Sequence, residues 1–269
     1  MNTAEQLQGT AHIAAAFKNH KAFIPFITVG DPDLSTTKKF VHTLVSAGAD
    51  LVELGIPFSD PTAEGPVIMK ASEIALHSGT TTDQVFALTK ELREEGIEVP
   101  FLYMTYANVV FSYGIERFMR AAREAGADGL ILPDVPYEEK AEFDAPAKAA
   151  GLSLISMIAP TSEDRIAKIA REAAGFIYVV SSLGVTGVRQ EITTDIGAMV
   201  KLVKENTDVP CAVGFGISTP EQAAEMAAIS DGAIVGSAIV RQIQDAGEGA
   251  VEAIRTYAGA MAKAVHKSK

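Results

Sequence analysis

Short apolar runs alternate with longer amphipathic stretches along this chain, and no other feature constrains its fold as strongly. The runs are rich in Val, Ile, Leu and Phe, and turn residues follow them. In Ile177-Tyr178-Val179-Val180 every residue is apolar, which is typical of a strand buried on both faces of a parallel sheet. The predicted strands are residues 23–29, 51–54, 101–105, 129–132, 153–158, 176–180, 211–213 and 232–235.

A stretch with helical periodicity follows each predicted strand. Between residues 116 and 125, Phe118, Met119, Ala122 and Ala125 fall on one side of a helix. The string Ala-Gly-Ala-Asp occurs at 47–50 and again at 125–128, each time after a helical stretch and before a strand. We expect its glycine to end the helix.

Eight strand–helix units in 269 residues match the size of an α/β TIM barrel, (β/α)8. An open, doubly wound sheet is the alternative, but Gly30-Asp31-Pro32-Asp33 after the first strand does not match its G-x-G-x-x-G fingerprint. We therefore predict a single TIM-barrel domain over residues 1–269, with an extra N-terminal helix and long loops after strands 2 and 6. These loops, 55–66 and 181–194, belong to the C-terminal face, where barrel enzymes hold their active sites and long loops act as lids.

Composition and charge exclude several classes of protein. A net charge of −11 argues against nucleic acids and acidic membranes as partners, because both would be repelled. Cys211 is the one cysteine, so an intramolecular disulfide and a Cys-based metal cluster are both excluded, and we expect no metal site. We find neither a signal-peptide pattern nor about 18 consecutive apolar residues, so we expect a soluble, cytoplasmic protein.

Carboxylates gather at the end of the second predicted strand. Glu53 interrupts an apolar strand, so we expect its side chain to point into the barrel, with a raised pKa that suits proton transfer at neutral pH. Asp60 and Glu64 follow on the loop. A purely structural Glu53, hydrogen-bonded to a neighbouring loop, remains open, as do a turn-capping Asp60 and a solvated Glu64.

Glycines follow the seventh and eighth predicted strands. Gly214 and Gly216 come after the seventh, and Gly236-Ser237 follows the eighth and begins a helix. Barrels bind phosphate at this place, through backbone N–H groups and the N-terminus of a short helix. Each glycine alone is more often a turn residue, but together they predict a phosphate site.

Several longer strings carry a resemblance to a known family. They are Phe-Ile-Pro-Phe-Ile-Thr-Val-Gly-Asp-Pro from residue 23, Glu-Leu-Gly-Ile-Pro-Phe-Ser-Asp-Pro from 53, Met-Thr-Tyr-Ala-Asn from 104, Pro-Asp-Val-Pro from 133, Gly-Val-Thr-Gly from 184, Gly-Phe-Gly-Ile-Ser from 214 and Gly-Ser-Ala-Ile-Val from 236. Over almost its whole length the chain resembles tryptophan synthase α subunits.

The resemblance implies retro-aldol cleavage of indole-3-glycerol phosphate to indole and glyceraldehyde 3-phosphate, in tryptophan biosynthesis and without a cofactor in this subunit. It implies that Glu53 is the catalytic acid/base and that Glu64 is the second catalytic carboxylate. The substrate-binding residues that it implies are Phe26, Tyr106 and Tyr178 around the indole, Thr186 in the lid, and Gly187, Gly216, Gly236 and Ser237 at the phosphate.

The resemblance also implies a partner. This is a tryptophan synthase β subunit that carries pyridoxal phosphate, in an α2β2 tetramer, and Asp60, Asn108 and Pro136 match positions near the interface. Structural readings of these three residues stay open as well: a turn cap, a strand-end hydrogen bond and a rigid turn.

Two positions depart from the family pattern. Glu64 stands where an aspartate is usual, which lengthens the carboxylate's reach by about 1.5 Å. Ser182 stands where an arginine is frequent in the lid. A second hypothesis is therefore a catalytically weak barrel that mainly activates the β subunit. A third, indoleglycerol-phosphate synthase, lacks support because no lysine follows a predicted strand.

Overall fold

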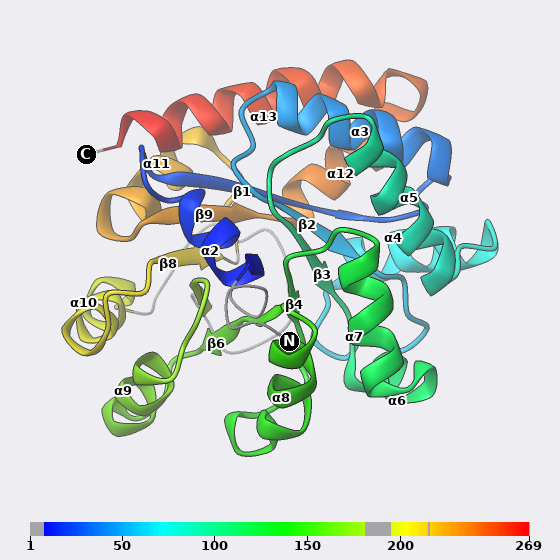
Figure 1. Ribbon diagram of the computed structural model, residues 1–269. Helices are drawn as coiled ribbons and strands as arrows, with labels where there is room; N and C mark the ends of the chain where they lie inside the picture. Colours follow the sequence, from blue (N-terminus) through cyan, green and yellow to red (C-terminus); the bar gives the residue numbers. More distant parts are fainter. Residues whose placement is uncertain (1–7, 181–194, 215, 269) are drawn as a thin grey trace.

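The computed structural model describes residues 8–180, 195–214 and 216–268, and its centre is a parallel sheet (Figure 1). The sheet has nine strands in the order β5-β4-β3-β2-β1-β9-β8-β7-β6. Their bounds are β1 Ala22–Thr28, β2 Val52–Gly55, β3 Phe101–Met104, β4 Gly129–Ile131, β5 Ser153–Leu154, β6 Ser156–Ile158, β7 Ile177–Val180, β8 Cys211–Gly214 and β9 Gly232–Val235.

The two ends of this sheet are parts of one barrel strand. β5 pairs with β4, β6 pairs with β7, and only Ile155 separates β5 from β6. The Ile155 N–H still donates to the Leu130 carbonyl at 2.9 Å. Because barrel strands are staggered, the ladders to the two neighbours use different halves of the same strand. The nine segments thus occupy eight positions, which confirms the predicted (β/α)8 barrel with the strand predicted at 153–158 interrupted at one residue.

Helices surround the sheet on its outside (Figure 1). Their bounds are α3 Leu34–Ser46, α4 Pro66–His77, α5 Thr82–Glu94, α6 Ala107–Tyr113, α7 Ile115–Glu124, α8 Ala141–Ala149, α9 Glu163–Arg171, α10 Ile196–Asn206, α11 Pro220–Ile229, α12 Ser237–Ala246 and α13 Ala250–Lys267, with the short 3-10 turns η1 Tyr137–Glu139 and η2 Gly247–Gly249. The loop predicted after the second strand separates β2 from α4. The loop predicted at 181–194 lies outside the described residues.

The predicted extra N-terminal helix is α2, Gln8–Ala15, and it lies across the end of the barrel where the strands begin (Figure 1). Ile13 of α2 is fully buried against inward residues such as Leu102 and Phe176. The Gly9 N–H donates to the Gly151 carbonyl at 3.2 Å. A side chain on Gly9 would come within 2.3 Å of the Asp128 carbonyl oxygen, so glycine is needed for this close approach.

Side chains alternate between the barrel interior and the helix layer, as the two-residue period of a strand requires. In β1, Ile24 and Phe26 belong to the interior cluster, while Phe23 and Ile27 pack under the helices. By the same alternation Leu51 and Glu53 point inward. A parallel strand buried on both faces is apolar throughout, and Glu53 is the exception in β2.

Aspartates connect neighbouring strands where the strands begin. The backbone N–H groups of Phe23, Phe101 and Cys211 donate to the carboxylates of Asp50, Asp128 and Asp231, respectively, at 2.8, 3.1 and 3.0 Å. Asp50 and Asp128 are the last residues of the two Ala-Gly-Ala-Asp strings. Gly48 and Gly126 have φ of +106° and +98° and directly follow the C-caps of α3 and α7, which confirms the predicted helix ends.

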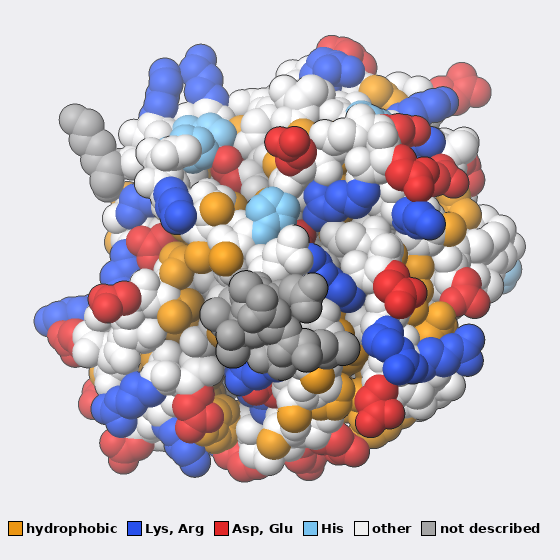
Figure 2. Space-filling model, in the orientation of Figure 1, with side chains coloured by type: hydrophobic (Ala, Val, Ile, Leu, Met, Phe, Trp, Pro, Cys, Tyr) orange, Lys and Arg blue, Asp and Glu red, His pale blue; other side chains and the backbone are white. Residues whose placement is uncertain are grey.

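The face on which the strands begin carries charges of both signs. Figure 2 shows acidic and basic side chains interspersed over it. Among the residues that the structure describes, no helix is both long enough and apolar enough to cross a bilayer.

Asp128 is the most heavily bonded of the three aspartates, and its removal should weaken the whole fold. Its side chain is 4% exposed and faces Arg93 at 2.9 Å and His12 at 2.9 Å. Asp128→Ala removes the carboxylate that pairs with Arg93 and leaves the buried Phe101 N–H without its acceptor, so we expect the free energy of unfolding to fall by about 3–5 kcal/mol. Urea unfolding followed by circular dichroism measures this loss.

Asp144→Ala is the control, because the ion pair that Asp144 makes in the described part of the chain is with Lys148, one helical turn away, whose side chain is 57% exposed. We expect a loss of about 0.5 kcal/mol or less there. Equal losses in the two variants would contradict the assigned role of Asp128.

Candidate active site

Glu53 places a carboxyl group inside the barrel at the level of Phe26 and Leu102, its partners on the adjacent strands. The residue is 1% exposed, and its Oε1 has no hydrogen-bond partner among the described residues. Burial raises its pKa well above the ordinary 4.5, and the nearby Glu64 carboxylate raises it further. Both effects favour the protonated form of Glu53, which can act as a proton donor.

Glu64 brings a second carboxyl group to the same place from the loop between β2 and α4. Although it lies in a loop, it is only 5% exposed. Its N–H donates to the Pro61 carbonyl at 3.0 Å, which closes a turn. The Tyr106 hydroxyl accepts the Ala63 N–H at 3.2 Å and donates to the Glu64 carboxylate. The solvated Glu64 that the sequence left open is thus excluded.

Two of the predicted pocket aromatics lie over glycines of neighbouring strands. A Cβ on Gly55 would come within 2.6 Å of the Phe26 ring, and a Cβ on Gly214 would come within 2.4 Å of the Tyr178 hydroxyl. Any larger residue would displace the rings. Burial raises the pKa of Tyr178 well above its usual range, and the charges of Glu53 and then Glu64 add to the shift. Both carboxyl groups and Tyr178 therefore lie close together.

A pocket lined in part by Glu64 lies at the ends of β1, β2 and β3. Its lining residues are Phe26, Thr28, Gly55, Ile56, Phe58, Pro61, Glu64, Ile68, Ser72, Met104 and Tyr106. The Phe58 and Tyr106 rings lie 5.4 Å apart. Flat, apolar walls with a few polar groups suit an aromatic ligand that carries a polar edge.

Some polar groups near this pocket were not predicted from the sequence. Thr28, Asp31 and Thr105 are each buried with one side-chain oxygen unpartnered among the described residues, and they follow or end β1 and β3. Burial raises the pKa of Asp31 to about 6. Thr28 lies two residues after Phe26, so the strand period could have indicated that both side chains face the barrel interior. Nothing in the local sequence distinguishes Thr105 from an ordinary strand-end residue.

The predicted phosphate residues lie on adjacent strands, since β8 pairs with β9. Gly216 has a φ of +78°, which favours glycine. Ser237 begins α12, and unlike α5 and α11, this helix has no capping side chain at Gly236. The first N–H groups of a helix without such a cap can bind an anion. Thr186 and Gly187 lie outside the described residues.

Asp60, Asn108 and Pro136 lie apart from the pocket. All three are exposed, and they follow β2, β3 and β4, which are successive strands of the sheet. Asp134 accepts the Ala107 N–H at 3.1 Å and so connects the start of α6 to the loop after β4. On α6, Phe111 exposes 47% of its surface. These residues belong to the loops that follow three successive strands, and we call this part of the rim the outer sector.

Comparison with known proteins agrees with this arrangement. The family model of the tryptophan synthase alpha chain matches residues 13–266. This chain belongs to that family. It is 47% identical over 257 residues to the tryptophan synthase alpha chain of Lacticaseibacillus casei, which covers 96% of each chain. It is 50% identical over 228 residues to that of Shouchella clausii, covering 85% of each.

Solved structures give the same result. The tryptophan synthase alpha chain from Legionella pneumophila superposes with a TM-score of 0.84 at 36% identity, covering 98% of this chain and 97% of that one. A chain of Mycobacterium tuberculosis tryptophan synthase gives 0.84 at 32% identity, with 96% of each covered. Membership confirms the resemblance seen in the sequence and makes the chain a lyase of tryptophan biosynthesis, which excludes the indoleglycerol-phosphate synthase hypothesis.

The buried Glu53 should cost stability in a pH-dependent way. Its pKa in the folded protein is raised, so the folded state binds the proton more tightly than the unfolded state, and the free energy of unfolding falls as pH rises above about 4.5. Glu53→Gln removes the titrating group, so we expect this variant to be more stable than the wild type at pH 8 by about 1–3 kcal/mol.

Urea unfolding at pH 5 and pH 8 tests this expectation. The difference between the two proteins should shrink at pH 5. Glu73→Gln, at an exposed residue, is the control and should follow the wild type at both values. A Glu53→Gln protein that is less stable than the wild type at pH 8 would show that the carboxylate has a stabilising partner.

Proposed function

We propose that this chain cleaves indole-3-glycerol phosphate to indole and glyceraldehyde 3-phosphate by a retro-aldol reaction, with Glu53 and Glu64 as its catalytic residues. The observation that carries the proposal is a carboxyl group buried inside the barrel, Glu53, close to a second carboxylate, Glu64, which lines an aromatic pocket. The reaction needs both functions: a proton donor for the ring and an acceptor for the positive charge that follows.

Glu53 would supply the proton. Protonation at indole C3 turns the ring into a cation that can accept the electrons of the bond between C3 and the side chain. Loss of a proton from the adjacent hydroxyl then forms the aldehyde, the carbon–carbon bond breaks, and the electrons return to the ring. One proton is added and one is removed, so the reaction balances without a cofactor. Once Glu53 has given up its proton, it can accept the one from the hydroxyl.

Glu64 would stabilise the cation. The positive charge on the protonated ring is shared with the ring nitrogen, and its N–H needs an acceptor. The hydrogen bond from Tyr106 holds the Glu64 carboxylate at the pocket wall, although its side chain is one carbon longer than the usual aspartate. A charge fixed in place before the reaction stabilises the transition state without reorganisation.

The remaining assignments concern binding. We place the indole between Phe26, Tyr106 and Tyr178. We place the phosphate at Gly216, Gly236 and Ser237, where α12 presents uncapped N–H groups. Gly187 would also bind the phosphate, and Thr186 would belong to the lid.

The partner in this proposal is a tryptophan synthase β subunit that carries the pyridoxal phosphate, in an α2β2 tetramer. It would bind the outer sector of Asp60, Asn108 and Pro136, where Phe111 offers exposed apolar area. We further propose that residues 1–269 form one domain and that the protein is cytoplasmic.

Glu53→Gln should abolish cleavage and leave substrate binding largely intact. The amide keeps the shape of the side chain but cannot donate and recover a proton. We expect indole formation to fall by at least about 10³-fold with an unchanged dissociation constant, since general acid–base groups contribute roughly 10²–10⁴-fold. Indole release in the presence of saturating β subunit is the assay, and equilibrium dialysis gives the affinity. Turnover within tenfold of the wild type would contradict the catalytic role, and a wild type without measurable indole formation would contradict the proposed reaction.

Two substitutions at Glu64 separate charge from length. Glu64→Asp keeps the charge and restores the length usual in the family, so we expect turnover within about tenfold of the wild type or above it. Glu64→Gln keeps the length and removes the charge, and we expect a loss of roughly 10²-fold in kcat. An aspartate variant as inactive as the glutamine variant would mean that the loop is built around the longer side chain.

A further inference from the structure

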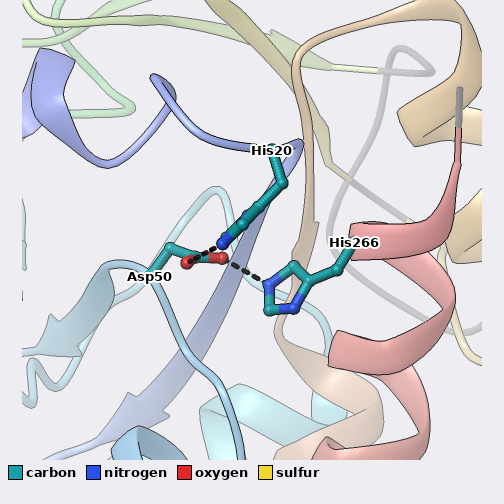
Figure 3. A group of neighbouring side chains, drawn as sticks. All are labelled: His20, Asp50 and His266. Atoms are coloured by element: carbon teal, nitrogen blue, oxygen red, sulfur yellow. Dashed lines mark hydrogen bonds and ion pairs between the residues drawn. The ribbon is translucent and has the colours of Figure 1, made fainter.

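Two histidines and an aspartate meet at the end of the barrel opposite the proposed active site. His20 precedes β1, Asp50 precedes β2, and His266 lies in the last turn of α13. Figure 3 shows both imidazoles directed toward the Asp50 carboxylate. The Nε2 of His20 is 3.7 Å from Oδ1, and the Nε2 of His266 is 2.8 Å from Oδ2. The ring centroids are 4.0 Å apart.

The tautomer of His20 is fixed by its other nitrogen. Nδ1 lies 3.1 Å from the Lys21 carbonyl oxygen, which can only accept a hydrogen bond, so Nδ1 carries the proton. In the neutral ring the lone pair is then on Nε2, the atom that faces Asp50. An imidazole that donates one N–H to a backbone carbonyl and offers its other nitrogen is the usual arrangement of a metal-binding histidine.

The carboxylate and the second imidazole are also held in place. The Phe23 N–H donates to Asp50 Oδ2 at 2.8 Å. Next to it, a Cβ on Gly48 would come within 3.1 Å of the Ala262 Cβ and 3.4 Å of the His266 ring. The absence of a side chain at Gly48 therefore allows α13 to approach closely enough to bring His266 to Asp50.

The charge around Asp50 distinguishes it from the other two aspartates at this end of the barrel. Asp128 pairs with Arg93, and Asp231 with Lys204, both permanent cations at neutral pH. In the described parts of the chain, the ion-pair partners of Asp50 are only the two imidazoles. Asp50 therefore lacks a lysine or arginine partner there, and a divalent cation would place positive charge beside it.

We propose that His20, Asp50 and His266 bind one divalent transition-metal ion, with Zn²⁺ as the representative ligand. In tetrahedral coordination, Zn–N and Zn–O bonds of about 2.1 Å put neighbouring donor atoms about 3.4 Å apart. The observed distances of 2.8 and 3.7 Å, which end on the two different oxygens of Asp50, lie on either side of this separation, and one ligand atom from each residue can be chosen so that all three lie within 4.8 Å of one another. The side chain of His20 is 37% exposed, so water can reach the fourth position. Binding displaces the Nε2 proton of His266 and connects the end of α13 to the starts of β1 and β2.

Zinc titration of the untagged chain, freed of metal with a chelator, tests the proposal by isothermal titration calorimetry. We expect the wild type to bind one equivalent of Zn²⁺. His20→Ala and Asp50→Asn should each weaken the affinity by roughly tenfold or more. Asp50→Asn keeps an acceptor for the Phe23 N–H, and His20→Ala alters only a partly exposed side chain, so both variants should fold. Zn²⁺ should also raise the Tm of the wild type and leave that of His20→Ala unchanged.

His12→Ala is the matched control, because His12 lies at the same end of the barrel, faces Asp128 and is 38% exposed. It should bind Zn²⁺ like the wild type. Less than one equivalent of Zn²⁺ bound at about 0.1 mM free Zn²⁺ would overturn the proposal. An unchanged Zn²⁺ affinity in His20→Ala would do the same, as would equal losses of affinity in the His12 and His20 variants. Indole formation is measured separately. The metal site lies away from the catalytic pocket, so a chain that fails to bind zinc would leave the proposed cleavage reaction intact.

Discussion

The mouth of this barrel is organised around one unfavourable interaction, a carboxyl group buried without a cation. Glu53 interrupts the apolar strand β2, and the charge of another carboxylate, Glu64, raises its pKa further. Desolvation and repulsion both favour the protonated form. A cation at this place would hold Glu53 ionised and remove its ability to donate a proton. The proposed role of Glu53 as an acid therefore depends on the absence of such a partner among the described residues.

The carboxylates at the two ends of the barrel strands have opposite surroundings. Where the strands begin, Asp50, Asp128 and Asp231 each accept a backbone N–H from the neighbouring strand and face histidine, arginine or lysine. These contacts stabilise the fold. Where the strands end, Glu53 lacks such bonds and destabilises it. TIM barrels characteristically place stabilising contacts at one face and the active site at the other. The contacts at the starts of the strands can thus offset the free energy of unfolding that is lost at the active-site face.

Most of the fold and part of the site follow from local sequence. Continuous apolar runs identify all barrel strands, and inward alternation identifies Glu53, because both depend only on the strand period. The break at Ile155 depends on the stagger between strands, which no local pattern encodes. The burial of Glu64 was likewise unpredictable: its loop position favours exposure, whereas the side chain is buried beside Tyr106, which lies far along the chain and donates to its carboxylate.

Tyr106 also connects the pocket to the outer rim. Its hydroxyl holds Ala63 and Glu64, and its ring packs against Phe58, two residues before Asp60. The next residue, Ala107, begins α6 and donates its N–H to Asp134 in the loop that leads to Pro136. The surface proposed for the β subunit is thus built on the same segments that position the second carboxylate. A partner that shifts α6 by a fraction of an ångström would move Tyr106, and with it Glu64, relative to a Glu53 that the barrel keeps fixed.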